Sequence, residues 1–333
     1  MSPQTSGRQA ARRGLRLWNV GIVLIVVFMS AVVVAGFVFY TGWDLLGARA
    51  LKKQQRVDPN TLFDLVKLAF GVVAGSGALV ALVVAYRRQR VDEDAALRDV
   101  SRLHNERFAN AVSQLGSESP AVRLGGVHAL AGLADDAPTS QLRQTCIDVL
   151  CAFLRLPYTA EDDLQTGDAL ARQGFLAPRE ARHTVIRLIR DHLRLPPGHA
   201  RSWQGHDFDF TGAVFDGGDL SHATFAGGTV SFYGATFSGG TVNFHGARFS
   251  GGRVLFTGAR FSGCTVDFFK AMFSSGRVDF FGASFTGGRT SFTGATFSDT
   301  LVNFTEATGH IPEGLRTRTG APVSACVFLA ADW

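Results

Sequence analysis

The hydrophobic positions of the chain change their spacing twice, and each spacing predicts a different kind of element. Near the N-terminus, two runs of residues, 20–40 and 68–86, carry no charged side chain. At about 1.5 Å per residue, each run is roughly as long as the hydrocarbon layer of a bilayer is thick. Tryptophan and tyrosine flank the first run, as is typical at the level of the lipid headgroups. The pattern predicts two transmembrane helices, over 18–43 and 67–87.

Two other interpretations of these runs fit the residues less well. A cleaved signal peptide would have a shorter apolar region and a small-residue cleavage site, whereas the first run continues into YTGWDLL. Gly71, Gly75 and Gly77 in the second run lack the strand, turn and lysine of a phosphate-binding loop. The spacing of Gly71 and Gly75 instead fits close packing between two helices in a membrane.

Positive charges beside the two runs predict their orientation. Four arginines precede the first run within the basic segment 1–17, and Arg87, Arg88 and Arg90 follow the second run. Because basic flanking segments stay in the cytoplasm, both termini are expected there, in an inner or plasma membrane. The predicted extracytoplasmic loop, 44–66, also carries four basic residues, which argue for the opposite orientation.

The segment 88–200 has apolar residues at helical spacing among many charges. Gly116 suits the end of one helix, and Ser119 with Pro120 suits the start of the next. Small residues at 125–129 predict close helix contact. The segment is therefore expected to be all-α, with one HEAT-like hairpin but too few repeats for a helical solenoid. The predicted helices cover about 91–115, 120–137, 140–155 and 178–195.

Further along the chain, large apolar residues stand five apart, beginning with Phe210, Phe215 and Leu220. A small residue, such as Ala213 or Gly218, lies two positions before several of them. In this pattern the segment 201–306 resembles the pentapeptide-repeat family. The resemblance implies a right-handed β-helix with one pentad on each of four sides, in which the large and the small residue both point inward.

From about residue 230, the spacing becomes five, five and two, so that the unit FxGAxFSGGxVx is 12 residues long. Residues two apart on a strand face the same way, so the extension is expected to place two side chains inward on one lengthened side. A coil then holds either twenty residues or, as we expect, twenty-four. The predicted core positions are Phe210, Phe215, Leu220, Phe225, Val230, Phe237, Val242, Phe244, Phe249, Val254, Phe256, Phe261, Val266, Phe268, Phe273, Val278, Phe280, Phe285, Phe292, Phe297, Val302 and Phe304.

The period is lost after 306, and the tail 307–333 is expected to cover the open end of the coil, as the helical segment would cover the other. Thr290 interrupts the column of valines, and Cys264 stands where other units have glycine, so it is expected to be a small inward residue. A calcium-binding repeat would need aspartate in every unit. Asp267 and Asp279 share a column with asparagine, serine and leucine, which argues against calcium.

Composition and charge agree with this division of the chain. The 333 residues are 46% hydrophobic and only 18% charged, below the roughly 25% of soluble domains. The net charge of +5 lies largely in the N-terminal arginines, because 205–305 holds six basic residues against seven aspartates. This balance is a poor footprint for nucleic acid. The four cysteines form no CxxC pair, which indicates free thiols in a reducing compartment.

No catalytic, cofactor or metal motif is recognisable in the sequence. His192, His199 and His206 are seven residues apart, which matches no known pair of metal ligands, so a linker is the better interpretation. We therefore expect a non-enzymatic membrane protein whose cytoplasmic β-helix is a scaffold for another protein, with the bilayer as its second partner. Outward arginines are the expected contacts, one column holding Arg253, Arg277 and Arg289 and another holding Arg248 and Arg260.

Two alternative functions remain open at this stage. Some members of the pentapeptide-repeat family mimic DNA and bind type II topoisomerases, but such mimicry needs a strongly acidic surface. An enzyme or metal-binding protein with an unrecognised site is the other alternative.

Overall fold

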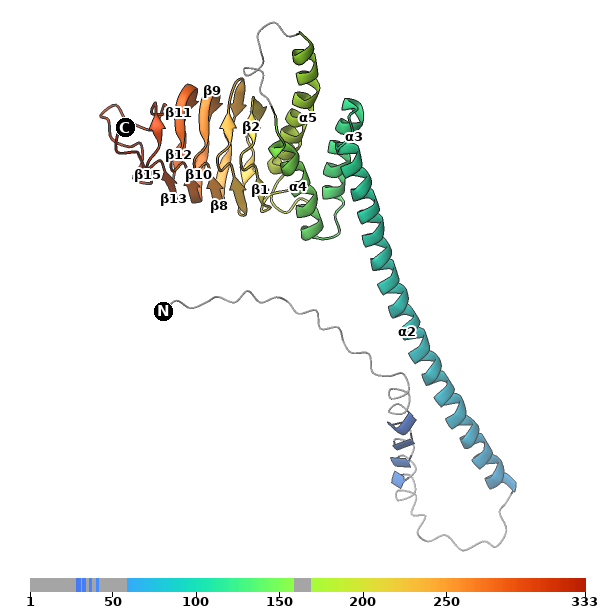
Figure 1. Ribbon diagram of the computed structural model, residues 1–333. Coiled ribbons are helices and arrows are strands. Elements are labelled where there is room, and N and C mark those ends of the chain that lie inside the picture. Colours follow the sequence, from blue (N-terminus) through green and yellow to red (C-terminus); the bar gives the residue numbers. More distant parts are fainter. Residues whose placement is uncertain (1–27, 31, 34–35, 38–39, 42–58, 159–168) are drawn as a thin grey trace. The chain divides into compact units, whose positions relative to one another are not determined.

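The computed structural model describes residues 28–30, 32–33, 36–37, 40–41, 59–158 and 169–333, which form two compact units, Met1–Asp99 and Val100–Trp333. Helix α2 (Pro59–Leu115) contributes to both units (Figure 1). The second predicted span lies inside α2, whereas most of the first span and of the loop that follows it lies outside the described residues. Within the described part of the chain, no helix combines the length and apolar character that crossing a membrane requires.

The segment after α2 is helical, as predicted. It contains α3 (Pro120–Asp135), α4 (Ser140–Arg155) and α5 (Ala169–Arg194). Gly126 lets α3 approach the end of α2, because a Cβ there would lie 2.4 Å from the backbone nitrogen of Leu115. Thr139 caps α4 by accepting a hydrogen bond from the backbone of Leu142 at 3.2 Å. The likeness of this segment to a HEAT hairpin stays a prediction.

The start of the last helix was predicted wrongly. Proline suits the first turn of a helix, so Pro178 was placed there, but α5 begins at Ala169 and continues through Pro178. Proline inside a helix removes one backbone donor. The helix nevertheless continues to Arg194, and its C-terminal half is fixed by contacts with the next part of the fold, described below.

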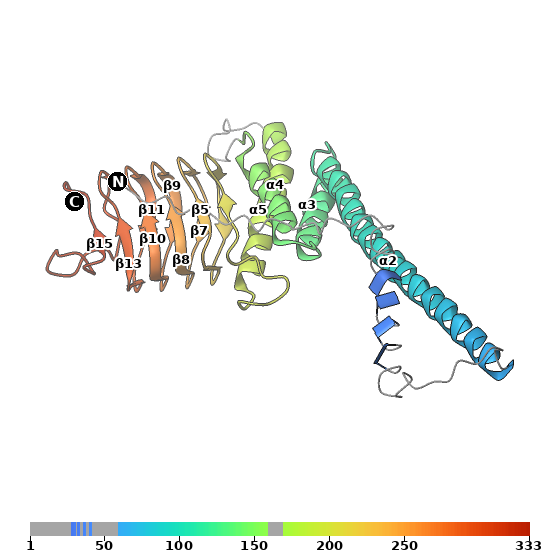
Figure 2. The same cartoon turned by 90° about the horizontal axis from the view of Figure 1, so that it is seen from below.

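The C-terminal part is a parallel β-solenoid built from two sheets, which we name sheet A and sheet B (Figures 1 and 2). The chain alternates between the sheets, since strands of sheet A pair only with others two 12-residue units away. Sheet A comprises β1 (Phe208–Asp209), β4 (Thr224–Phe225), β5 (Thr229–Ser231), β8 (Arg248–Leu255), β10 (Met272–Asp279), β12 (Thr296–Phe297), β13 (Thr300–Asn303) and β15 (Val327–Phe328). Sheet B comprises β2 (Val214–Phe215), β3 (Gly218–Asp219), β6 (Thr236–Phe237), β7 (Thr241–Asn243), β9 (Arg260–Asp267), β11 (Ser284–Ser291) and β14 (Thr308–Gly309).

The strand register gives the length of a coil. Phe225 pairs with Phe249, and Phe249 with Phe273, so each of these coils has 24 residues, or two 12-residue units. The first coil is shorter, because Phe215 pairs with Phe237, 22 residues later. That coil contains four pentads and one two-residue extension, while the later coils contain four pentads and two extensions. The expected coil of 24 residues is therefore present from the second coil onward, and the handedness stays a prediction.

Stacked phenylalanines fill the solenoid in four columns. Within each column the ring centroids of successive coils are 4.5 to 5.2 Å apart and the rings are stacked. Stacking contributes about 0.5–1.5 kcal/mol per pair beyond the burial of apolar area. The core is therefore a continuous aromatic rod rather than a set of separate clusters.

Four-residue turns of the form FxGA connect the two sheets. In each turn the alanine N–H bonds the phenylalanine carbonyl, for example Ala259 to Phe256 at 3.0 Å. The third position has a positive φ, such as +65° at Gly258, which glycine adopts without strain. His222, Lys270 and Glu306 take the same conformation without being glycine.

Both ends of the solenoid are covered. Helices α4 and α5 lie against the first coil, and the C-terminal tail folds over the last one (Figure 2). In the tail, the Trp333 ring contacts those of Phe285 and Phe304, and its indole N–H donates to the Gly309 carbonyl at 3.1 Å. The ladder of rings therefore ends on an aromatic residue instead of on solvent.

Candidate interaction surface and its helical cap

The predicted core positions lie inside the solenoid. All of them are buried except Phe297, which is partly buried, and Cys264 is buried as well. Burial raises the pKa of the Cys264 thiol to about 12, so it is protonated and unreactive at neutral pH. Phe208 and Phe232 are also buried, although the sequence pattern did not single them out.

The predicted arginine columns were wrong. Arg253 and Arg277 do share a column of sheet A, but Arg289 lies in sheet B, opposite Thr265. Arg248 and Arg260 are likewise on different sheets, where they pair with Met272 and Ser284. The cause is the 24-residue coil: residues 12 apart occupy equivalent positions on opposite sheets, and only those 24 apart stand in one column.

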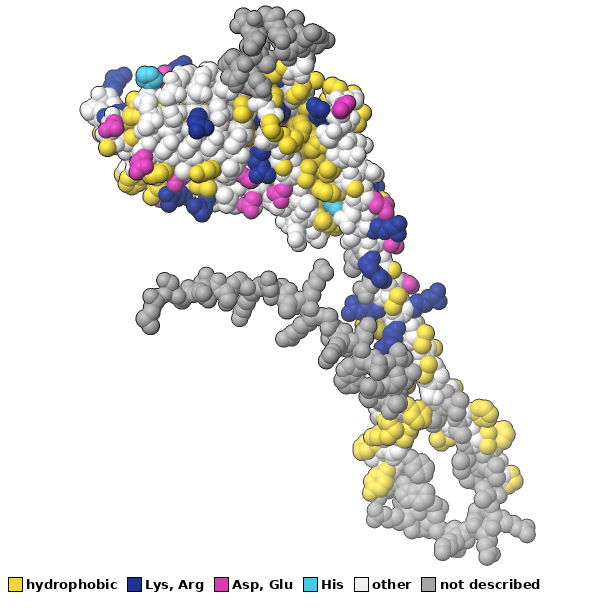
Figure 3. Space-filling model, in the orientation of Figure 1, with side chains coloured by type: hydrophobic (Ala, Val, Ile, Leu, Met, Phe, Trp, Pro, Cys, Tyr) yellow, Lys and Arg dark blue, Asp and Glu magenta, His cyan; other side chains and the backbone are white. Residues whose placement is uncertain are grey.

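The outward faces of the two sheets differ in chemistry. On sheet B, the outward positions of β6, β9 and β11 are mainly serine, threonine and glycine, and Arg289 there is held by Glu313 at 2.6 Å. On sheet A and its adjoining turns, large apolar side chains are exposed beside arginines. Figure 3 shows hydrophobic and basic side chains together on the side of the solenoid that carries β8, β10 and β13.

A row of arginines on α5 binds the first coil. Arg182 donates to the Val214 carbonyl at 2.6 Å, and Arg194 donates to the Ser221 carbonyl at 2.7 Å. Arg190 lies between them and forms an ion pair with Asp219. Since the first coil has no preceding coil, these arginines supply donors that a preceding strand would otherwise supply.

The carboxylate of Asp216, at the end of β2, is the most enclosed acid of this junction. Its partners are the Tyr158 hydroxyl at 2.6 Å, the Arg179 guanidinium at 3.2 Å and the His183 ring at 3.2 Å. Burial raises the pKa of Asp216, but the hydrogen bonds from His183 and Tyr158 and the positive charges beside it outweigh burial and hold it below its ordinary value. Asp216 is therefore an ionised structural group in a cluster of mutually satisfied partners.

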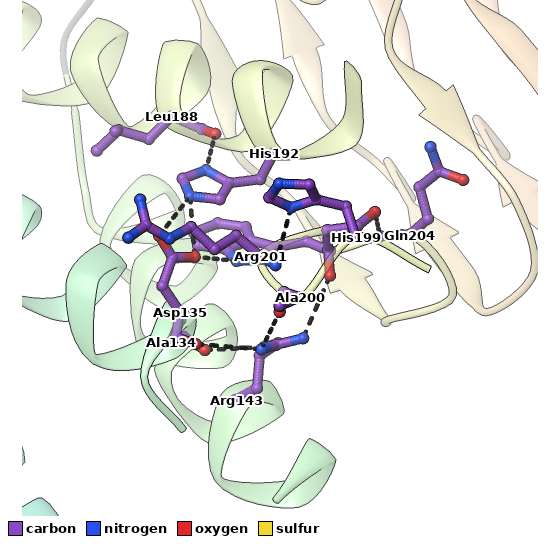
Figure 4. A network of polar contacts seen from close by, with 11 residues as sticks. Ala134, Asp135, Arg143, Leu188, His192, His199, Ala200, Arg201 and Gln204 are labelled. Atoms are coloured by element: carbon purple, nitrogen blue, oxygen red, sulfur yellow. Dashed lines mark hydrogen bonds and ion pairs between the residues drawn. The ribbon is translucent and has the colours of Figure 1, made fainter. Parts of the chain in front are cut away.

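A second polar network, shown in Figure 4, joins α3, α4 and α5 to the chain that enters the solenoid. His192 has one ring nitrogen 2.6 Å from the Leu188 carbonyl and the other 3.0 Å from the Asp135 carboxylate. Both partners are acceptors, so the ring donates from both nitrogens. Arg143 donates to the carbonyls of Ala134 and Ala200 at 2.8 and 2.6 Å. This network fixes the linker in place.

The histidines of the predicted linker have separate structural partners. His192 belongs to the network above, the His199 ring accepts from the Arg201 backbone at 3.1 Å, and His206 contacts Gln144 at 3.0 Å. Across the residues that the structure describes, no group of three or more histidine, cysteine or acidic side chains is placed to hold a metal ion.

The aspartates considered for calcium have a different role. The carboxylate of Asp267 accepts a hydrogen bond from the backbone N–H of Phe269 at 2.9 Å, and Asp279 does the same for Phe281 at 3.1 Å. Each bond fixes the entry to an FxGA turn, as is typical of an Asx turn. Asparagine and serine in the same column do likewise, which explains why the column mixes these residue types. Leu255 occupies this column without being able to make the bond.

Comparison with known proteins agrees with this architecture. Residues 210–254 match the family model described as pentapeptide repeats, with nine copies. No curated protein and no solved structure matches the chain significantly. The matched residues cover the coils in which the five-residue spacing is least interrupted, and the same ladders and turns continue beyond them. The C-terminal half of this chain thus carries a pentapeptide-repeat β-solenoid.

Proposed function

We propose that the protein is a non-enzymatic scaffold whose solenoid binds another protein. The observation that supports this proposal is the difference between the two faces of one rigid body: sheet B is small and polar, while sheet A exposes aromatic, aliphatic and basic side chains. Tyrosine, phenylalanine and arginine are enriched at protein interfaces. The aromatic ladders hold these side chains on a backbone that needs little ordering on binding, which favours affinity.

We further propose that the scaffold is anchored in the inner or plasma membrane with both termini in the cytoplasm. This proposal rests on the uncharged runs 20–40 and 68–86 and on the arginines beside them, and the described residues do not supply it. Cys326 gives a direct test, because it is partly exposed whereas the other three cysteines are buried. A membrane-impermeant maleimide is expected to label Cys326 only after lysis. Labelling of intact cells would exclude a cytoplasmic C-terminus.

The scaffold function is tested by crosslinking in living cells followed by purification of the full chain. A partner is expected to be recovered with the native chain and to bind the purified chain saturably when reconstituted. Phe256→Asp is the matched negative control, because a charge placed in the ladder disrupts the solenoid while leaving the helical segment unchanged in sequence. A partner retained equally by Phe256→Asp would show that the solenoid is not the binding element. Inhibition of a type II topoisomerase at stoichiometric protein would instead favour the DNA-mimic alternative.

A further inference from the structure

Exposed apolar side chains gather on one margin of sheet A. Leu301 lies on β13, Phe328 on β15, and Phe281 and Tyr233 lie in the turns that leave this sheet. Their exposed fractions run from 37% for Phe281 to 55% for Tyr233. The strand register makes these positions neighbours, since Asn303, two residues after Leu301, pairs with Phe328. The margin is thus one continuous surface across several coils.

Arginines stand in the same surface. Arg253, Arg277 and Leu301 occupy one outward column in three successive coils. Arg277 is paired with Asp279 at 2.7 Å. Among the described residues, no carboxylate forms an ion pair with Arg253 or with Arg248, which lies on the same strand. The surface therefore offers free guanidinium groups at one end of the column and apolar side chains at the other.

We propose that this margin of sheet A, defined by Arg253, Leu301, Phe281 and Phe328, binds an extended protein segment that contains both a carboxylate and an apolar side chain. The inference rests on the proposed scaffold function and names its binding surface and the chemistry of its partner. The carboxylate pairs with Arg253, whose planar guanidinium suits two parallel hydrogen bonds. The apolar side chain packs on Leu301 and Phe328.

The register sets the spacing that the partner must have. Arg253 and Leu301 are two coils apart in one column, and neighbouring strands lie about 4.8 Å apart, so the two anchor points are separated by roughly 10 Å. An extended chain advances about 3.3 Å per residue. The acidic and the apolar residue of the partner are therefore about three positions apart, in a segment that runs along the solenoid axis.

A protein partner fits this surface better than an anionic membrane. Asp299 and Glu306 are exposed on the same side of the solenoid, and Asp279 already neutralises Arg277. The net charge of the face is thus close to zero, whereas attraction to anionic lipid grows with each uncompensated basic residue. Discrete pairing with Arg253 still favours a partner that places one carboxylate correctly.

The test is a selection of random dodecapeptides displayed on phage against the purified full chain, followed by fluorescence anisotropy of the enriched peptides. Peptides with an acidic and an apolar residue about three apart are expected to be enriched. Arg253→Glu and Leu301→Asp should each weaken their binding at least about tenfold, as loss of a charged hydrogen bond would. Arg260→Glu is the matched control on sheet B and should leave binding unchanged. Lysine in place of the peptide's acid should restore binding to Arg253→Glu.

Three results would overturn the proposal. The first is the absence of enrichment, and the second is equal weakening by Arg253→Glu and Arg260→Glu. The third is retention on mixed phosphatidylcholine and phosphatidylglycerol vesicles that Arg253→Glu abolishes and Arg260→Glu does not, which would identify the membrane as the occupant. A partner crosslinked in cells that stays bound to the Arg253→Glu, Leu301→Asp double variant would refute this surface but leave the scaffold function standing.

Discussion

Two glycines with nearly the same backbone angle test how closely the coils are stacked. Gly252 has φ +71° and Gly258 has φ +65°, so alanine at either position meets similar conformational strain. Left-handed backbone costs an L-residue about 1–2 kcal/mol, partly offset by about 0.4–1 kcal/mol from the stiffer unfolded chain. A Cβ on Gly258 would meet no atom within 4 Å. Gly258→Ala should therefore reduce the free energy of unfolding by about 1 kcal/mol.

Gly252→Ala adds a collision with the preceding coil. Its Cβ would lie 2.1 Å from the Gly228 carbonyl oxygen, well inside the 3.0 Å below which Cβ contacts are essentially never found. The coils would have to separate by roughly 1 Å, which breaks the 3.0 Å hydrogen bond from the Arg253 N–H to that oxygen and strains its neighbours. Each buried group left unpaired costs about 1–3 kcal/mol, so the total should reach about 3–5 kcal/mol.

Thermal unfolding of the full chain, followed by far-UV circular dichroism, separates the two effects. In a unit of this size, 1 kcal/mol lowers the midpoint by about 2–4 °C, so Gly258→Ala should shift it by about 3 °C and Gly252→Ala by about 10 °C or more. Equal shifts for the two variants would refute the reasoning, because the glycine at 252 would then serve only its backbone angle.

Three further predictions concern the ladder, the turns and the cap. Phe256, stacked at 4.6 Å on both sides, should lose about 1–3 kcal/mol as leucine, and Phe297, with one stacked neighbour, about half as much; equal losses in urea unfolding would contradict the ladder. Leu255→Asn should raise the midpoint slightly by completing the Asx column, and a lower midpoint would count against that role. The pKa of Asp216 lies below that of an unfolded aspartate, about 3.9, so its contribution is complete above about pH 5 and is lost as the pH falls through the folded value. Asp216→Asn should thus be destabilised at pH 7 and approach the native chain near pH 3, whereas a constant difference would show that ionisation is not involved.

The repeat was predictable from the sequence because its core is periodic. Phe244, Phe256 and Phe268 recur at fixed intervals, and an interval of five plus five plus two is consistent with a lengthened side. The sequence could not say which repeats stack, and the mistaken grouping of Arg289 with Arg253 follows from that gap. Only the pairing of Arg253 with Arg277 in the strand register shows that alternate units share a face.

The helical cap was predictable in kind but not in detail. Its contacts join residues far apart in the chain, such as Tyr158 with Asp216 and Arg194 with Ser221, and no local spacing encodes them. Pro178 was misleading for a related reason: a local preference for the start of a helix gave way to a helix whose C-terminal half is held against the first coil. The turn aspartates carried a usable signal, because Asp, Asn and Ser in one column are typical of Asx and related turns.

The two-unit coil also limits how such a chain can grow. Inserting or deleting a single 12-residue unit would carry every later unit to the opposite face, so that the exposed Leu301 would emerge on the side that is now serine and threonine. Recombination within the repeat would keep the two faces distinct only in steps of two units. The face that carries Arg253, Arg277 and Leu301 is in this sense inherited by every second unit, and its neighbours in the sequence belong to a separate lineage of positions.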